Sequence, residues 1–361
     1  MCGDVLGAKE KEVKVAIVCT GIHDSSEVLE GYWRNIKKYG HENDVLTYFI
    51  PDVKTPNFVI PPNVFCPDLN EQDKFLEKVG FPSEDIPRNS DNRRNVGYLM
   101  ALRDGADIVI SIDDDNYCLP GVDFVGTHVS AIRDKVSSSH LQLDRVSTSR
   151  WFNNCSLLWP TVGHPRGFPY FARENCSTWN VAHEDNKLEV CINEGLWLGD
   201  ADLDAISWIA GPKKVTRHQP PASIVLGEDS WCPINSQNTA VRRDAMAAYY
   251  FVLDPRFGDI FGGYFALKCA KRLGLTARFG TPLVEHKRNT HHYLSDAQRE
   301  IDSIVMLEKL LPSLLEYRLS GSSFGDAYLC LADFIAEQGA VWYVETARLM
   351  RQWAKSCRII G

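Results

Sequence analysis

Long apolar runs are missing from this sequence. The first apolar run, Val15 to Cys19, is much shorter than the about 20 residues that a membrane-spanning helix needs. It is also too short for the core of a signal peptide. No other run approaches that length, and neither internal repeats nor low-complexity segments occur. We therefore expect a soluble protein without a transmembrane segment, located in the cytoplasm.

Paired cysteines and an excess of positive charge are also missing. The 11 cysteines include no Cys-x-x-Cys pair, which argues against a zinc ribbon or a disulfide framework and favours reduced thiols. The formal net charge is -8, whereas nucleic-acid-binding proteins carry a basic patch. DNA and RNA are therefore excluded as predicted partners.

What the 361 residues do contain is an alternation of strands and helices. Val13 to Cys19 predicts a buried strand. A helix follows, with Asp24 and Glu27 as a capping pair and Gly40 as its C-terminal cap. The next strand is expected at Val45 to Ile50. Such a unit predicts two parallel strands joined by a right-handed crossover.

A second alternation leads to three consecutive aspartates. Helices are expected at Glu71 to Val79, closed by Gly80, and at Arg94 to Arg103, and a strand follows at Asp107 to Ile112. The segment Asp113 to Asp115 comes directly after this strand. Open α/β sheets bind ligands at the carboxyl ends of their strands, so these aspartates are predicted to lie in a site.

The second half of the chain has weaker periodicity. Aromatic residues, glycine and proline are dense from Trp151 to Trp208, which predicts an irregular region that shapes a substrate pocket. A capping box at Ser295 and Gln298 is expected to begin a helix. The segment Tyr328 to Ile360 predicts one or two amphipathic helices that pack on the sheet or on a second subunit. A homo-oligomer formed through these helices is a candidate assembly.

Three adjacent carboxylates repel one another unless a cation is bound nearby. Mg²⁺ and Mn²⁺ take oxygen ligands and commonly bridge substrate phosphates. A solvated acidic turn is the simpler alternative. Another alternative is the aspartyl-phosphate nucleophile of haloacid-dehalogenase-like phosphatases. That family has a threonine two residues past its second aspartate, whereas Asn116 and Tyr117 follow Asp115 here.

Several motifs, taken in order, resemble the reversibly glycosylated polypeptide family, whose plant members are UDP-arabinopyranose mutases. The resemblance covers roughly residues 85 to 300. It implies an α/β fold of the GT-A-like, Rossmann-like type, with a mixed sheet flanked by helices and with C-terminal helices. The motifs are RNVGY from Arg94, SIDDDNY from Ser111, RGFPYFARE from Arg166, GLWLGDADLDA from Gly195, NTA from Asn238, RFGDIFGG from Arg256, and His286 after TPLVE.

The resemblance implies a metal-dependent nucleotide site. Asp113, Asp115 and His286 would bind a divalent ion, Mn²⁺ or Mg²⁺. A core or surface histidine is the alternative for His286, and a surface arginine is the alternative for Arg94. The implied nucleotide contacts are Thr20, Arg94, Asp113 and Asp114.

The same resemblance places two arginines near the reacting carbon of the sugar. Arg166 and Arg173 lie in RGFPYFARE, and the family pattern implies that Arg166 receives the sugar covalently. A guanidinium is protonated and a poor nucleophile, so stabilisation of the diphosphate as the anomeric bond breaks is the alternative role. Asp259 stands where inverting GT-A enzymes place a base. These three are the predicted catalytic residues.

A further group of residues is predicted to face the sugar. Carboxylates accept hydrogen bonds from hydroxyl groups, and an indole ring can cover the apolar side of a sugar ring. The predicted residues are Trp197, Asp202, Asp204 and Asn238. Capping of turns is the alternative for the two aspartates and the asparagine.

The opening segment VAIVCTGIHDS departs from the plant pattern in the region that normally contacts the base. Uridine is therefore not settled by the resemblance. Bacterial relatives that act on GDP-linked sugars, including a GDP-L-galactose mutase, make guanosine an alternative.

Together these observations predict a metal-dependent, flavin-free mutase that interconverts the pyranose and furanose forms of a UDP- or GDP-linked sugar. Residues 1–120 are predicted to form the nucleotide-binding half, residues 121–295 the sugar-binding and catalytic half, and residues 296–361 a C-terminal helical extension. A glycosyltransferase with a separate acceptor and a self-glycosylating nucleotide-sugar-binding scaffold are the two alternatives.

Overall fold

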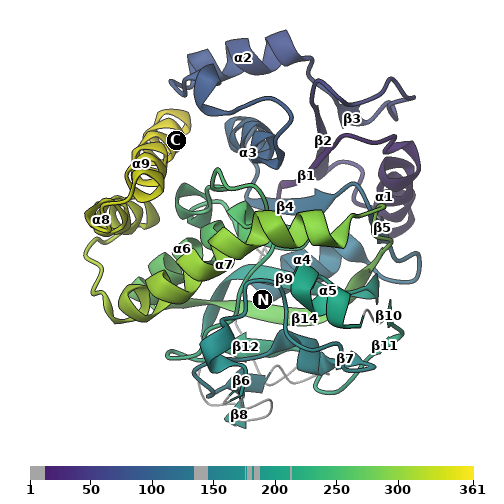
Figure 1. The fold of residues 1–361 in the computed structure, drawn as a ribbon. Coiled ribbons are helices and arrows are strands. Elements are labelled where there is room, and N and C mark those ends of the chain that lie inside the picture. Colours follow the sequence, from purple (N-terminus) through teal and green to yellow (C-terminus); the bar gives the residue numbers. More distant parts are fainter. Residues whose placement is uncertain (1–12, 134–144, 175, 177–180, 183–187, 212–213) are drawn as a thin grey trace, which may run out of the picture.

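The computed structural model describes residues 13–133, 145–174, 176, 181–182, 188–211 and 214–361. A mixed sheet flanked by helices runs through these residues, and long helices from the last part of the chain lie across and beside it (Figure 1). The predicted α/β class with C-terminal helices is confirmed.

The N-terminal part of the sheet consists of parallel strands. β1 (Val15–Gly21) lies between β2 (Val45–Pro51) and β4 (Ile108–Asp113), and β3 (Val64–Phe65) extends the sheet beyond β2. β1 is almost entirely buried, as its continuous apolar sequence requires for a parallel strand covered on both faces. The predicted parallel pair is confirmed, and so is the strand that leads into the three aspartates.

The first helix, α1 (Ser26–Tyr39), starts differently from the prediction. Asp24 accepts a hydrogen bond from the backbone N–H of Ser26 at 2.9 Å, but the capping pair with Glu27 is not formed. At the other end Gly40 adopts a φ of 76°, the left-handed conformation that a C-terminal glycine cap needs. The predicted end of this helix is therefore confirmed.

Two further helices precede the aspartates. α2 (Leu69–Lys78) begins two residues earlier than predicted, because Asp68 and Glu71 form a capping box. α3 (Arg94–Arg103) has the predicted bounds. α3 packs very closely on the sheet at Gly97, where a Cβ atom would lie 2.5 Å from Cγ1 of Val18.

Beyond β4 the sheet changes direction. β13 (Asn238–Arg242) is antiparallel to β4, and β9 (Glu189–Asp200) is antiparallel to β13. Four parallel strands followed by one reversed strand make the mixed sheet that the GT-A-like prediction requires. The start of β13 lies opposite the end of β4, so the loop before Asn238 reaches the aspartates.

β14 (Leu275–His286) carries the chain back to the same edge of the sheet. It runs parallel to β9, and its last residues pair with the short strand β5 (Asn116–Cys118). His286 is opposite Asn116 in this register. A histidine distant in sequence is thereby brought beside the aspartate that precedes β5.

The region from residue 151 to residue 208 is more regular than predicted. β9, a strand of 12 residues, lies within it, because a strand buried on both faces lacks the alternation that reveals a half-exposed strand. The remaining helices and strands of the described residues are α4 (Phe124–Arg133), β6 (Arg145–Ser147), β7 (Leu158–Trp159), β8 (Val181–Ala182), α5 (Ala205–Ala210), β10 (Lys214–Val215), β11 (Arg217–His218), β12 (Ile224–Leu226) and α6 (Gly258–Arg272).

The chain ends in three helices, α7 (Tyr293–Glu316), α8 (Phe324–Glu337) and α9 (Val341–Ile360). The predicted capping box at the start of α7 is wrong, because His292 occupies the cap and its ring accepts the backbone N–H of Ser295. α8 and α9 confirm the two predicted helices and join the main core. Within the described residues, no helix combines the length and the apolar character needed to cross a bilayer.

Candidate functional site

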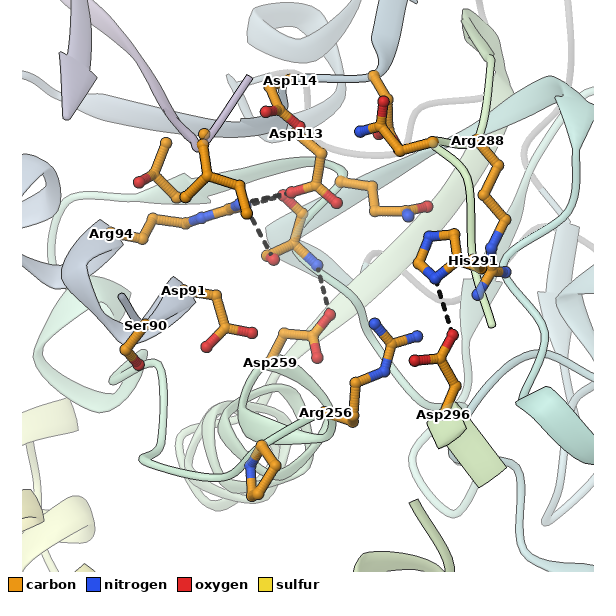
Figure 2. Close-up of a pocket in the computed structure, with 18 of the residues that line it drawn as sticks. Ser90, Asp91, Arg94, Asp113, Asp114, Arg256, Asp259, Arg288, His291 and Asp296 are labelled. Atoms are coloured by element: carbon orange, nitrogen blue, oxygen red, sulfur yellow. Dashed lines mark hydrogen bonds and ion pairs between the residues drawn. The ribbon is translucent and has the colours of Figure 1, made fainter. Parts of the chain in front are cut away.

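A cavity of about 1070 Å³ opens where β1, β4 and β14 end. Segments far apart in the sequence meet here, including the loop before α6 and the first turns of α7 (Figure 2). Most of the predicted site residues line it. These are Thr20, Arg94, Asp113, Asp114, Asp115, Arg166, Asp202, Asp259 and His286.

Arg94 is an internal anchor of this cavity. It is 3% exposed, and its guanidinium donates to the carboxylate of Asp113 at 2.5 Å. It also donates to the hydroxyl of Ser111 and the backbone carbonyl of Ser236, both at 2.9 Å. The surface-arginine alternative is therefore wrong, and Arg94 fixes the position of Asp113.

Asp114 faces the loop after β1. A Cβ atom on Gly21 would lie 2.2 Å from its Oδ2 atom, so only glycine allows this approach. Oδ2 is buried and has no hydrogen-bond partner among the described residues. Burial and the charges of Asp115 and Asp113 raise the pKa of Asp114 to about 6. The carboxylate repulsion expected from the sequence is thus present in the structure.

Asp115 and His286 face each other across the edge of the sheet. Nδ1 of His286 lies 2.6 Å from the backbone carbonyl of Asp200, and Nε2 lies 3.3 Å from Oδ2 of Asp115. A carbonyl can only accept, so Nδ1 carries the proton and Nε2 points its lone pair toward Asp115 unless a second proton is bound. Burial lowers the pKa of His286, but the charge of Asp115 and its hydrogen bond to the ring have the larger combined effect, so the pKa is raised.

These two side chains fit a divalent ion. A carboxylate oxygen and an imidazole nitrogen are suitable donors for Mn²⁺ or Mg²⁺, and the hydrogen bond to Asp200 orients the ring as metal-bound histidines usually are. Among the described residues, however, no group of three or more His, Cys, Asp or Glu side chains is already arranged around one point. Asp113 is held by Arg94 and does not join the pair.

Arg166 lies at the other end of the cavity between two carboxylates. It makes two hydrogen bonds to Asp202, at 2.9 and 3.2 Å, and two to Asp259, at 2.9 and 2.7 Å. It also donates to the backbone carbonyl of Arg256 at 2.6 Å. Burial alone would lower the pKa of Arg166, but the two carboxylates outweigh it and raise the pKa well above the usual value. The resting guanidinium is therefore protonated.

Arg173 and Asp204 do not line the cavity as expected. They form an ion pair at 2.6 Å, and Arg173 packs on the ring of Tyr170. Asp204 also caps α5 by accepting the backbone N–H of Ser207 at 2.7 Å. The capping alternative therefore describes Asp204, because its oxygens are used within the protein.

Trp197 and Asn238 are also placed away from the cavity. Trp197 is fully buried in the core as part of β9. Asn238 is fully buried and bonds to the ring of His128 at 2.9 Å and to the carbonyl of Leu196 at 3.1 Å. Neither side chain faces a sugar in this cavity, in contrast to the prediction.

The sequence reasoning missed Arg288, which follows His286 by two residues. Its Nε atom is buried without a hydrogen-bond partner, and it makes no ion pair with a carboxylate of the described chain. The guanidinium packs 5.0 Å from the ring of Trp208, which stacks on Tyr293. The position of Arg288 directly after the strand that ends at His286 was the signal in the sequence that it could lie in the site.

Other missed residues surround the same space (Figure 2). Asp91 is exposed to the cavity beside Arg94, and desolvation within the cavity together with the charge of Asp259 raises its pKa to about 7. Arg256 is bound to the carboxylate of Glu300 at 3.1 Å. Charged groups of both signs therefore line the walls, as a charged and hydroxyl-rich ligand would require.

Comparison with known proteins matches almost the whole chain to one family. The family model described as "Reversibly glycosylated polypeptide" matches residues 9–360. This range is longer than the segment that carries the motifs and includes the C-terminal helices.

Curated relatives carry consistent names. UDP-arabinopyranose mutase 1 of Arabidopsis thaliana is 25% identical over 314 residues, covering 77% of this chain and 80% of the relative. UDP-arabinopyranose mutase 1 of Oryza sativa subsp. japonica is 24% identical over 278 residues, covering 73% of this chain and 70% of the relative.

Among solved structures, the chain is similar to glucosyl-3-phosphoglycerate synthase from Mycobacterium tuberculosis in complex with Mn²⁺, UDP-glucose and phosphoglyceric acid. The TM-score is 0.44 at 13% identity, covering 82% of this chain and 79% of that one.

Proposed function

Since this chain belongs to the reversibly glycosylated polypeptide family, we propose that it is a nucleotide-sugar mutase that interconverts the pyranose and furanose forms of its sugar. The observation that carries this proposal is a single cavity with carboxylates and an imidazole at one end and a doubly paired arginine at the other. The first end suits a nucleoside diphosphate, and the second suits the sugar carbon that reacts.

The nucleotide would bind along Thr20, Arg94 and the aspartates. Asp113 and Asp114 would accept hydrogen bonds from the ribose, and Arg288 would bind the diphosphate. An arginine fork matches phosphate oxygens well, and this guanidinium has no ion pair of its own among the described residues. Asp115 and His286 would hold Mn²⁺ or Mg²⁺, which supplies charge stabilisation to the leaving diphosphate.

The sugar would lie near Arg166, Asp202 and Asp259. In the electrostatic role, the protonated Arg166 stabilises negative charge as the bond between C1 and the diphosphate oxygen breaks. In the covalent role, a guanidinium nitrogen bonds to C1 while the diphosphate leaves. The nitrogen then loses a proton to Asp259, whose Oδ2 already accepts a hydrogen bond from it at 2.7 Å. Both roles stay in the proposal.

The state of Asp259 favours a mutase over a transferase with a separate acceptor. A transferase base must be free to take a proton from the acceptor. Here both oxygens of Asp259 accept hydrogen bonds from Arg166. The self-glycosylating scaffold predicts labelling by a nucleotide sugar without turnover, so measuring turnover separates it from the mutase.

The deciding experiment is incubation with Mn²⁺ and candidate UDP- and GDP-linked sugars, without an acceptor. Formation of the furanose form is expected, with UDP-arabinose and GDP-L-galactose as the first substrates to test. Slow hydrolysis to free sugar as the only reaction would overturn the proposal.

The base is tested separately by thermal unfolding with UDP, GDP, ADP and dTDP in the presence of Mn²⁺. A nucleotide present at about a hundred times its dissociation constant adds about 2.7 kcal/mol to the free energy of unfolding. The nucleotide that raises the midpoint most identifies the base.

A further inference from the structure

A histidine and an aspartate that have no role in the site described so far form a pair at the cavity wall. His291 lines the cavity, and its Nδ1 atom lies 2.8 Å from Oδ2 of Asp296 in the first turn of α7. Asp296 is 6% exposed. Figure 2 shows the His291 ring bonded to Asp296 on one side, with its other side toward the cavity, across from Arg94 and Asp91.

The hydrogen bond sets which nitrogen is available to a ligand. A carboxylate only accepts, so Nδ1 of His291 carries a proton and donates it to Asp296. Nε2 is therefore the atom that can take or give a proton on the cavity side. A histidine oriented by a carboxylate in this way is the usual arrangement of a general base.

Three charged groups face this imidazole. Burial lowers the pKa of His291, and the charge of Arg288 lowers it further. The hydrogen bond to Asp296 opposes this change, while Arg256 adds to it. A diphosphate bound at Arg288 would offset the arginine charge, so substrate binding would favour the protonated ring at the moment when a proton donor is needed.

A change of ring size requires such a group. With C1 bonded to a guanidinium nitrogen of Arg166, the electron pair of that nitrogen forms a C1–N double bond as the six-membered ring opens. The bond between C1 and the ring oxygen then breaks, and the oxygen keeps the electron pair and takes a proton. When the five-membered ring closes, a neighbouring hydroxyl oxygen bonds to C1 and loses its proton, and the electron pair of the C1–N double bond returns to nitrogen. One proton moves between two oxygens of the sugar, with no net gain or loss.

We propose that His291, positioned by Asp296, transfers this proton. Its imidazolium form gives a proton from Nε2 to the departing ring oxygen, and the resulting neutral imidazole takes the proton from the hydroxyl that closes the new ring. The inference rests on the proposed mutase function with Arg166 in its covalent role, and assigns to it the acid–base step. Breaking of the bond to the diphosphate does not require His291.

The test separates these two steps in the His291→Gln variant. A nucleotide sugar labelled with ¹⁸O in the oxygen that bridges C1 and the diphosphate reports bond breaking, because the label moves to a non-bridging position when the bond breaks and re-forms. We expect this exchange to stay within about threefold of wild type. Furanose formation should fall by about 100- to 10,000-fold, the usual contribution of a general acid or base.

Two further variants make the result specific. Asp296→Asn keeps a hydrogen-bonding group but not the charge, so furanose formation should fall about tenfold or more and its pH profile should move, again with exchange retained. His41→Gln is the matched control, because His41 forms a similar pair with Asp123 at 2.9 Å outside the cavity. It should leave both steps unchanged.

The outcomes are distinct. Wild-type furanose formation retained in His291→Gln, or equal loss of exchange and furanose formation, overturns the inference while the mutase proposal stands. Absence of furanose formation in the wild type overturns the mutase function itself. His291→Asn is measured in parallel, with urea unfolding of each variant, so that a folding defect in one substitution is not mistaken for loss of chemistry.

Discussion

At the scale of single residues, the site is built from charges that hold one another in place. Arg166 is clamped by Asp202 and Asp259, while Arg94 fixes Asp113. Buried charges cost free energy unless they are paired, so each of these side chains has little freedom. Arg288 differs from them, because its Nε atom has no hydrogen-bond partner and its guanidinium makes no ion pair among the described residues.

Replacing Arg166 by lysine should disable the site. Lysine cannot make the four hydrogen bonds of the guanidinium, so Asp202 and Asp259 would be left partly unpaired. Furanose formation should fall by at least about 100-fold, and the free energy of unfolding in urea by about 3 kcal/mol. Arg150→Lys is the control, because Arg150 pairs with Glu316 at the surface. An active, fully stable Arg166→Lys protein would contradict this account.

Asp91 should make the stability of the protein depend on pH. Its pKa in the folded state is raised to about 7, compared with about 4 in an unfolded chain, and because the residue is exposed to the cavity, solvent screens part of this difference. Between these values the folded state binds a proton that the unfolded state releases, so this contribution is present at low pH and is lost as pH rises through 7. Asp91→Asn should therefore gain stability relative to wild type as pH rises from about 4.5 to about 7.5.

Urea midpoints of both proteins at the two pH values check this prediction. A difference between variant and wild type that stays constant with pH would show that Asp91 titrates normally.

At the scale of elements, the position of α3 on the sheet decides whether Arg94 reaches the aspartates at the end of the cavity proposed to bind the nucleotide. Gly97 lets α3 touch β1 and β2, and Arg94 stands at the start of the same helix. The edge where β4, β13 and β14 meet then aligns Arg94 with the aspartates and His286. A small shift of α3 would move Arg94 away from Asp113.

Gly97→Ala should show this coupling. The added Cβ atom would lie 2.5 Å from Cγ1 of Val18 and 2.9 Å from Cγ1 of Ile50, so α3 must move. Overpacking of this kind costs about 1–3 kcal/mol, and nucleotide affinity should fall as well. Gly31→Ala in α1 is the matched control, because a Cβ there meets nothing within 4 Å and alanine favours a helix by up to about 1 kcal/mol.

Urea unfolding and nucleotide titration are the measurements for this pair of variants. Equal stability changes of the same sign in Gly97→Ala and Gly31→Ala would contradict the close approach of α3.

At the scale of the whole molecule, the C-terminal helices belong to the main core. Trp353 of α9 is fully buried, packs 5.6 Å from the ring of Tyr250, and donates its indole N–H to the carbonyl of Met246 at 2.9 Å. Val341 of α9 is 86% exposed. A homo-oligomer formed through these helices remains a prediction, which the mass of the native protein in solution would decide.

Trp353→Ala should therefore destabilise the entire fold. Removing a fully buried aromatic side chain costs about 3–5 kcal/mol, and because the core is continuous the protein should still unfold in one transition. Trp159→Ala should have little effect, since Trp159 is 46% exposed. Circular dichroism and fluorescence in urea measure both variants. A separate early transition in Trp353→Ala would mean that the C-terminal helices fold as an independent unit.

Local patterns in the amino-acid sequence were sufficient for the elements that depend on neighbouring residues. The parallel strands β1 and β2, the bounds of α3, the glycine end of α1 and the position of the aspartates after β4 all follow from nearby residue types. Burial of one face of a helix or strand produces a periodic pattern of apolar residues, and this pattern is visible in the sequence. β9 has no such alternating pattern because both of its faces are covered.

Contacts between distant residues needed the folded chain. The ring of His286 reaches Asp115 across 171 positions, and Arg166 reaches Asp259 across 93. The register of β14 with β5, the pleat of β9 and the packing of α6 set these meetings, and the same constraints turn Trp197 and Asn238 away from the cavity. Which way a side chain points depends on strand pairing and on the elements packed above it, and neither is recorded in local residue order.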